Sequence, residues 1–317
     1  MIPPIIKDAL VYANLLLMLS IGFTLTYLTA KIPNFAHGTL AGIGVYIAFT
    51  VARILKLNAY LALPIAFLIV GIVELALYIT VIGTLKRMGA TFISLTIATI
   101  ALEIIISASI NIYADYISRA TGVFSRAFLM RKEDFNLFGL PGALIVSSIL
   151  VATLITTLHL MLTRTKFGIA MRATVENPAL AEMMGINTEK VTAISWFLTG
   201  GLAGLAGALL PLWFQGYPEI GNQLIVSVFA SSVLGGLSSI YGAMIGGYIV
   251  GLTEVLGTKM LASLIGAWIT AYRLLIPLTV LSIVLLIAPR GISGIIEDIM
   301  LSKALYKQKI MSGSKGG

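Results

Sequence analysis

The stretch "VTAISWFLTGGLAGLAGALLPLW", residues 191–213, decides the fold class of this chain. It carries no charged side chain and is longer than the ~20 residues that a helix needs to cross the hydrocarbon core of a bilayer. Within it, Gly200 and Gly204 stand four residues apart, and Gly207 falls close to the same face. Small residues at this spacing let two helix backbones approach each other in a membrane. The stretch therefore predicts a membrane-spanning helix that packs closely against its neighbours.

Similar apolar runs recur along all 317 residues, of which 58% are hydrophobic and only 11% charged, whereas soluble domains carry about 25% charged residues. The period-two alternation of an outer-membrane barrel is missing. We therefore predict an all-α polytopic membrane protein, one domain over residues 1–317, with about eight to ten transmembrane helices. The runs lie near residues 8–29, 36–52, 60–82, 91–113, 142–162, 191–213, 223–238, 240–256 and 268–288. Three of them are short and glycine-rich, as half-spans or broken helices are: 36–52, 223–238 and 240–256.

The residue types exclude several classes of function. The net charge is +8, but basic residues of membrane proteins gather in cytoplasmic loops, so nucleic-acid binding is not predicted. Cysteine is absent, and the two histidines, His37 and His159, lie far apart in the sequence, so no metal site is predicted. A P-loop is also absent. We expect no catalytic residue and no cofactor. The apolar N-terminus lacks a basic region before it and is read as a retained first span.

The longest polar interruption is "LTRTKFGIAMRATVENPALAEMMGINTEK", residues 162–190. Asn177 can cap a helix whose first residue is Pro178, and Gly185 can end it. One side of that helix carries three apolar residues, Leu180, Met183 and Met184. The pattern predicts a short two-faced helix between two spans. Its apolar face suits the membrane surface or a groove on a partner protein, and the pattern favours the partner only slightly.

A second polar break, "KIPNFAHG", covers residues 31–38. Pro33 ends the first helix, because the residue before proline avoids helical angles, and Asn34 can cap the next helix. His37 then lies in the first turn of that helix. A simple turn and cap explains these residues as well as a functional role does.

Two acids, Glu74 and Glu103, are the only ones well inside predicted spans. A carboxylate inside a membrane is costly, and its default interpretation is functional. The alternatives are proton coupling and a hydrogen-bonded glutamate at a helix interface.

Four motifs together resemble the permease subunits of branched-chain amino acid ABC importers of the LivH type. They are "PNFAHG", "TKFGIAMRATVENPALAEMMGINTEKV", "VLGGLSSIYGAMIGGYIVGLTEVLG" and "APRGISG", and the resemblance covers about residues 10–295. It implies the ABC importer permease fold, with residues 163–190 as the cytoplasmic loop that couples to an ATPase and residues 291–317 as a cytoplasmic tail. The coupling residues that it implies are Gly168, Arg172, Ala173, Glu176, Asn177, Pro178, Ala181, Glu182, Gly185 and Ile186. Candidates for the translocation path are Asn34, His37, Gly38 and Gly42. One departure is that "ALAE", residues 179–182, replaces the Glu-Ala-Ala of the older pattern.

The resemblance also implies partners. They are a second homologous but non-identical permease, two ATP-binding cassette subunits and an extracytoplasmic substrate-binding protein, all at the cell membrane of a prokaryote. ATP hydrolysis is then expected in the partner subunits, and the chain itself is a transport subunit. With residues 163–190 in the cytoplasm, the N-terminus lies outside, and the long loop at 114–141 suits docking of a soluble partner. The alternatives are an ion-coupled secondary transporter, an ABC permease for urea, amides or a sugar, and a structural scaffold.

Overall fold

Helices make up most of the computed structural model, which describes residues 3–295 and residue 299. Most of the predicted tail at 291–317 lies outside these residues. In the described part of the chain, eight helical stretches are long and apolar enough to cross a membrane, and Ile220–Gly235 is a shorter apolar helix. The eight stretches are Pro4–Ala30, His37–Ile54, Ala59–Arg87, Phe92–Thr121, Gly142–Arg164, Thr188–Trp213, Ile240–Ile265 and Leu275–Ile295. The predicted all-α polytopic fold is confirmed.

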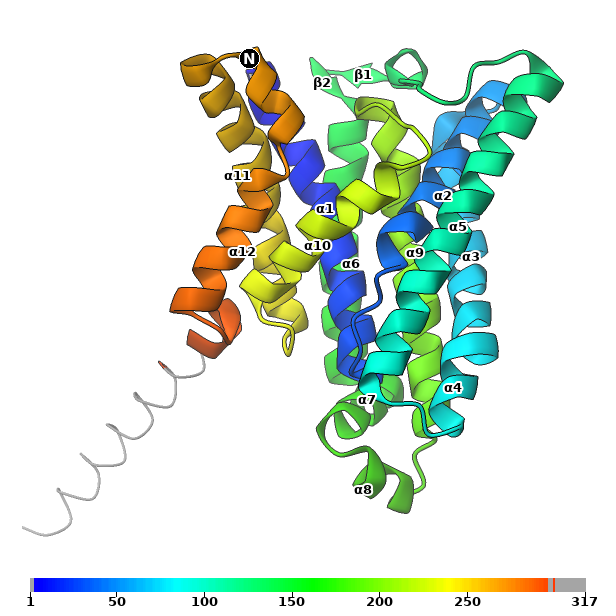
Figure 1. The fold of residues 1–317 in the computed structure, drawn as a ribbon, viewed down its shortest axis with the longest axis vertical. Coiled ribbons are helices and arrows are strands. Elements are labelled where there is room, and N and C mark those ends of the chain that lie inside the picture. The colour runs from blue at the N-terminus through cyan, green and yellow to red at the C-terminus, as the bar shows by residue number, and fades with distance from the viewer. Residues whose placement is uncertain (1–2, 296–298, 300–317) are drawn as a thin grey trace, which may run out of the picture.

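The elements run alternately between two ends of the bundle (Figure 1). The helices are α1 (Pro4–Ala30), α2 (His37–Phe49), α3 (Ala62–Leu77), α4 (Gly83–Arg87), α5 (Phe92–Thr121), α6 (Gly142–Arg164), α7 (Lys166–Glu176), α8 (Pro178–Met183), α9 (Thr188–Trp213), α10 (Ile220–Gly235), α11 (Ile240–Ile265) and α12 (Leu275–Ile287). Strands β1 (Asn136–Leu137) and β2 (Leu140–Pro141) form an antiparallel hairpin. We call the end that carries this hairpin and the start of α1 the hairpin end. The end that carries α4, α7 and α8 is the α8 end.

The interior of the bundle is built around α1 and α9. Nearly all of α1 is buried, because it packs against α6, α9, α10 and α11. The helix α9 packs in turn against α1, α2 and α3. Large side chains such as Phe23, Phe49 and Trp196 are fully buried between these helices. By contrast, only a minority of the residues of the stretches that contain α3, α5, α6 and α12 are buried, as expected for helices that face lipid.

Glycines on α9 set how closely its neighbours approach. A Cβ atom on Gly207 would lie 1.9 Å from the carbonyl oxygen of Ala41 on α2, and one on Gly204 would lie 2.4 Å from that of Ala66 on α3. No side chain fits at either distance, so these backbones touch directly. The same contact joins α11 to α1, where a Cβ on Gly251 would lie 2.6 Å from the Cα of Ala13. The predicted close packing is confirmed, and it supplies the dispersion contacts that hold helices together in lipid.

Two predicted boundaries are wrong. The α11 helix continues to Ile265 and α5 to Thr121, so the runs at 240–256 and 91–113 are only the apolar parts of longer helices. Polar residues such as Lys259 and Asp115 lower the hydropathy without breaking the helix. The run at 36–52 becomes a continuous stretch, because the backbone at Thr50–Ile54 extends α2 as a π-helical turn. Of the three short runs, only that at 223–238 remains short, as α10.

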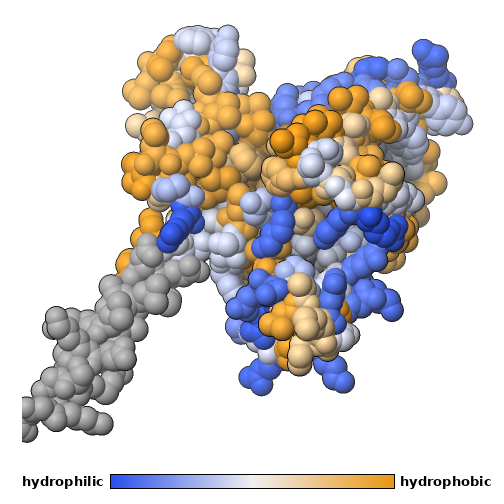
Figure 2. Space-filling view, turned by 60° about the horizontal axis from the view of Figure 1, so that its bottom comes forward, coloured by the Kyte–Doolittle hydropathy of each residue, from blue (hydrophilic) through white to orange (hydrophobic). Residues whose placement is uncertain are grey.

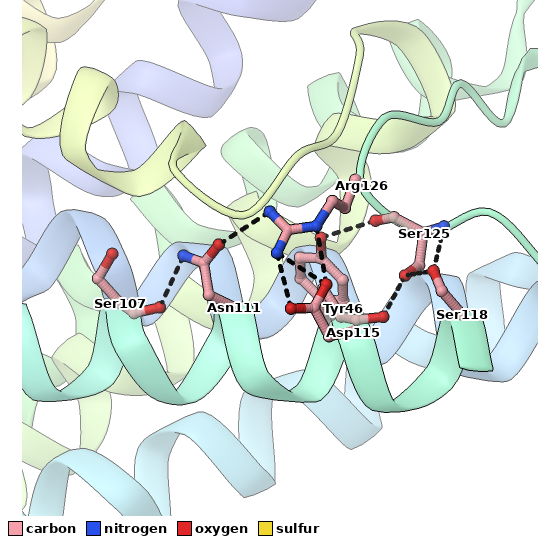
Figure 3. A network of polar contacts seen from close by, with 8 residues as sticks. Tyr46, Ser107, Asn111, Asp115, Ser118, Ser125 and Arg126 are labelled. Carbon is pink, nitrogen blue, oxygen red and sulfur yellow. Dashed lines mark hydrogen bonds and ion pairs between the residues drawn. The ribbon is translucent and has the colours of Figure 1, made fainter. Parts of the chain in front are cut away.

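At the hairpin end, the last turns of α5 hold the loop that follows it (Figure 3). The Arg126 guanidinium donates to both carboxylate oxygens of Asp115, from Nε and Nη2, each at 2.8 Å. The buried hydroxyl of Ser125 donates to the Ala114 carbonyl oxygen at 2.6 Å, and the Tyr46 hydroxyl donates to the Ser125 carbonyl oxygen at 2.8 Å. These contacts fold the loop back over α5 and α2. The loop predicted over 114–141 therefore begins only after Gly122 (φ +70°), where α5 ends.

The contact at Gly207 yields a test of the fold. We expect Gly207→Val to push α9 away from α2, since its Cβ would overlap the Ala41 carbonyl oxygen. Overpacking of this kind costs about 1–3 kcal/mol, so the thermal unfolding midpoint in detergent should fall. Gly257→Ala on α11 is the control, because its Cβ would meet only the flexible end of Ile276, at 3.2 Å. An equal midpoint for wild type and Gly207→Val would contradict the close contact.

Candidate functional site

The polar interruption between α6 and α9 folds into two helices that project from the α8 end. Thr165 caps α7, because its Oγ1 accepts a hydrogen bond from the Gly168 amide at 3.1 Å. Gly168 then packs against the end of α6, where a Cβ would lie 2.2 Å from the Met161 carbonyl oxygen. The sequence interpretation foresaw only α8. The sequence does contain a signal for α7, because Thr165 is a helix-capping residue and helix-favouring residues follow it.

The helix α8 has the predicted boundaries. The Asn177 side-chain oxygen accepts a hydrogen bond from the Leu180 amide at 3.0 Å, and Pro178 occupies the first turn. After Met183 the chain turns through Gly185, whose φ of +82° is one that L side chains rarely adopt. The Gly185 amide donates to the Glu182 carbonyl oxygen at 2.9 Å, and the Ile186 amide donates to the Ala181 carbonyl oxygen at 3.0 Å. The predicted cap, proline start and glycine stop are confirmed.

The apolar face of α8 points away from the protein. Leu180, Met183 and Met184 are 55%, 84% and 76% exposed, whereas Ala181 is buried. Figure 2 shows an apolar patch at the projecting tip of this end, surrounded by hydrophilic atoms. Methionine side chains are flexible and adapt to irregular grooves. The arrangement is that of a helix presented to a binding partner or to the membrane surface.

The α8 helix also has a polar contact with the start of α9. The Glu182 carboxylate accepts a hydrogen bond from the Thr188 hydroxyl at the start of α9. One residue later, Glu189 forms an ion pair with Arg87 of α4 at 2.7 Å. Beside α7, a groove of about 690 Å³ is lined by Arg172 and Glu176 and by the turn between α10 and α11. The α8 helix therefore contacts α9 directly, α9 is paired with α4, and α7 links α8 to α6.

The ten predicted coupling residues are thus brought together in one projection. Four lie on α7, three on α8, one at the junction of the two helices, and two in the turn that follows. In the same order these are Gly168, Arg172, Ala173 and Glu176; Pro178, Ala181 and Glu182; Asn177; and Gly185 and Ile186.

A second polar group lies in the interior of the bundle, where Asn34 and Glu74 meet. The Asn34 Nδ2 donates to the Glu74 Oε1 at 2.8 Å, and both side chains are buried. The Glu74 Oε2 has no hydrogen-bond partner among the described residues. A Cβ on Gly200 of α9 would lie 2.8 Å from this oxygen, so glycine leaves room for the carboxyl group. Asn34, a candidate for the translocation path, and Glu74, an acid inside a predicted span, are therefore direct neighbours.

The predicted capping of α2 by Asn34 is wrong. Ala36 is the N-cap residue, and the Asn34 side-chain oxygen accepts a hydrogen bond from the Ala36 amide at 3.2 Å. The α2 helix starts inside the bundle, because its first residue, His37, reaches the middle of α1. The His37 Nε2 lies 3.0 Å from the Leu19 carbonyl oxygen, which only accepts, so Nε2 carries the proton. Gly38 lies against Gly221 of α10.

The other predicted polar residues have different environments. Gly42 packs against Ile110 of α5, in a helix contact. Glu103 on α5 is partly exposed and has no hydrogen-bond or ion-pair partner among the described residues. The prediction that Glu74 and Glu103 are the only acids well inside spans is wrong, because Glu254 lies well inside α11 and is buried. It was missed because the predicted run ended too close to it.

The contact between Asn34 and Glu74 predicts non-additive effects on stability. Removing either side chain as alanine leaves the other polar group buried without its partner, which costs about 1–3 kcal/mol. The double variant Asn34→Ala/Glu74→Ala should therefore lose less than the sum, with an interaction energy of about 0.5–3 kcal/mol in the free energy of unfolding. Asn34→Ala combined with Glu103→Ala should be additive. Additive losses in both pairs would contradict the contact.

Comparisons with known proteins agree with this architecture. Residues 5–285 match the family described as branched-chain amino acid transport system / permease component. A protein of Methanocaldococcus jannaschii named "Probable branched-chain amino acid transport permease protein LivH" is 44% identical over 92% of this chain and 92% of its own length. The Escherichia coli K12 "High-affinity branched-chain amino acid transport system permease protein LivH" is 28% identical over 87% of this chain and 90% of its own.

One solved structure supports the fold alone. It is described as PsaBC from Streptococcus pneumoniae in complex with Fab, is 14% identical, and has a TM-score of 0.51 over 91% of this chain and 93% of that chain. The family match spans most of the sequence, and the archaeal relative is similar over nearly the full length. The chain therefore belongs to the permease family of branched-chain amino acid transport systems.

Proposed function

We propose that the chain is the membrane-spanning permease subunit of an ABC importer for branched-chain amino acids, and that α8 is the segment that docks on a partner ATPase. The observation that carries the proposal is the exposed apolar face of α8, held out from the bundle between two spans. The names of its relatives, which are branched-chain amino acid transport permeases, support the substrate class. Chemistry on the substrate is not required, because the task is to move a zwitterion past a layer in which its charges would be desolvated.

The mechanism follows from how α8 is attached. ATP binding closes two ATPase subunits and moves the docked α8 of each permease. Because Glu182 contacts Thr188 and Glu189 contacts Arg87, this motion is transmitted to α9 and α4. The spans then rock between inward-open and outward-open states, with α8 acting on a two-state element. The predicted coupling residues serve this step by shaping and holding the projection.

The complete importer has further subunits. We propose a second homologous permease, two ATP-binding cassette subunits at the α8 end, and a substrate-binding protein at the hairpin end. The α8 end then faces the cytoplasm of a prokaryotic cell, and the hairpin end faces outward. Asn34, His37, Gly38 and Gly42 are proposed to lie along the moving helix contacts that open the path.

Reconstitution in proteoliposomes tests the proposed function. Leucine uptake should require ATP, both ATPase subunits, the second permease and the binding protein. Uptake by this chain alone would show an ion-coupled secondary transporter instead. Glu74→Gln and Glu103→Gln test that alternative further, because a coupled carrier that uses these acids would lose the pH dependence of its uptake. Uptake of urea, an amide or a sugar in place of leucine would overturn the substrate class.

The turn after α8 yields a sharper prediction. A β-branched residue is strained at the positive φ of Gly185, so Gly185→Val should shift α8 without disturbing the spans. We expect about a ten-fold drop in leucine taken up per ATP hydrolysed, the factor that ~1.4 kcal/mol produces. Glu182→Arg, which removes the contact with Thr188, should act in the same direction.

The matched control is Gly89→Val. Gly89 has a similar positive φ of +79° and open space around it, but lies in the turn between α4 and α5. Its ratio of uptake to ATP hydrolysis should stay near that of wild type. A normal ratio for Gly185→Val and Glu182→Arg, with the protein folded in the membrane, would count against the docking role of α8.

A further inference from the structure

A cavity of about 580 Å³ lies at the hairpin end, between the start of α1 and the end of α11. Figure 1 shows the first turns of α1 beside the turn that joins α11 to α12. The lining combines charged side chains from three segments with apolar ones. The charged residues are Asp8, Glu254, Lys259 and Arg273. The apolar residues are Pro4, Ile5, Phe214 and Val255.

Glu254 is the buried centre of this lining, at 1% exposure. Its Oε1 accepts a hydrogen bond from the Tyr12 hydroxyl at 3.0 Å and from the Arg273 Nε at 2.9 Å. The Arg273 guanidinium carbon also lies 4.9 Å from the centre of the Tyr12 ring, which fixes the cation over the aromatic face. One carboxylate oxygen is thus held from two sides.

The other oxygen of Glu254, Oε2, is buried and has no hydrogen-bond partner among the described residues. An unpaired buried acceptor on a charged group is expensive, and a carboxylate inside a membrane-spanning helix is more so. An ion pair that served structure alone would gain from pairing both oxygens. Glu254 is one of the residues that line the cavity, and its second carboxylate oxygen is an acceptor that no described residue supplies with a donor.

The charges of the lining match one class of ligand. Two acids and two bases give the cavity no net charge, yet both signs are present within it. Asp8 is oriented by Trp213, whose indole Nε1 donates to the Asp8 Oδ1 at 2.8 Å. Lys259 is exposed, and no hydrogen bond links its ammonium group to another described residue. A zwitterion with an aliphatic side chain presents one positive group, one negative group and one apolar group, which is the same combination.

We propose that this cavity is a subsite for an aliphatic amino acid on its way into the bundle, with Glu254 accepting a hydrogen bond from the ammonium group and Lys259 pairing with the carboxylate. Arg273 positions Glu254 and retains further N–H donors for the carboxylate. The apolar residues at the start of α1 and after α9 cover the side chain. The proposal rests on the proposed function, which it deepens by naming where the permease itself holds the substrate.

Binding of radiolabelled L-leucine tests the site. The assembled permease and ATPase complex is placed in lipid nanodiscs without binding protein and without ATP, so that any leucine bound is held by the permease. Two competitors each lack one charge: 3-methylbutylamine lacks the carboxylate and 4-methylpentanoate lacks the ammonium group. Each should compete about ten-fold more weakly than leucine, the factor for the loss of ~1.4 kcal/mol.

Three variants separate the roles. Glu254→Gln should weaken leucine binding about ten-fold. Lys259→Met is exposed, leaves the pair of Glu254 and Arg273 intact, and should weaken leucine binding but not 3-methylbutylamine binding. Glu219→Gln, an exposed acid outside the cavity, is the control and should bind leucine as wild type does. Lys259→Met keeps the test decisive if Glu254→Gln fails to fold.

Two results would overturn the subsite. One is leucine binding that neither Glu254→Gln nor Lys259→Met changes, which would leave a structural ion pair only. The other is no leucine binding in nanodiscs by a complex that imports leucine when the binding protein and ATP are added. Absence of ATP-driven leucine uptake by the complete system would instead overturn the proposed function, and it is measured separately in proteoliposomes.

Discussion

Direct contact between the backbones of α9 and its neighbours is the constraint on which the rest of the structure depends. In lipid there is no hydrophobic force between apolar helices, so association relies on close packing and polar contacts. Gly204 and Gly207 let α9 touch the carbonyl groups of α3 and α2, and Gly200 leaves space for Glu74. A larger residue at any of these positions would separate the helices and open the interior to lipid or water.

The α9 helix also extends from one end of the molecule to the other. It begins directly after α8, at the end that carries the exposed apolar face, and ends at Trp213, which contacts Asp8 at the hairpin end. A continuous helix that reaches from the proposed docking segment to the proposed substrate subsite is a simple physical connection between them. The buried pair of Asn34 and Glu74 lies against the same helix. We infer that movement of α9 is what both proposed sites share.

Much of this could be predicted from the sequence, because its signals are local. Uninterrupted apolar runs indicate spans, and Asn177, Pro178 and Gly185 each have a backbone preference that fixes one boundary of α8. The resemblance of the polar motifs was needed to choose between a membrane surface and a protein groove for α8. The local pattern alone favoured the groove only slightly.

The remainder could not be predicted because it depends on contacts between distant segments. The environment of Glu254 is set by hydrogen bonds from Tyr12 and Arg273, which lie on other segments of the chain. Asn34 looked like a helix cap, yet its amide reaches Glu74 because α2 starts inside the bundle. The length of α11 was underestimated, since Lys259 lowers the hydropathy of a helix that nevertheless continues.

Photo-crosslinking from α8 tests the central claim most directly. The chain has no cysteine, so a single introduced thiol carries the label without background. Met183→Cys on α8 and Phe138→Cys at the hairpin tip, both highly exposed, are each labelled with benzophenone maleimide in the assembled importer. We predict that irradiation joins the label at 183, and not at 138, to an ATPase subunit. Crosslinking of the label at 183 to lipid alone, with ATPase present and active, would contradict the account.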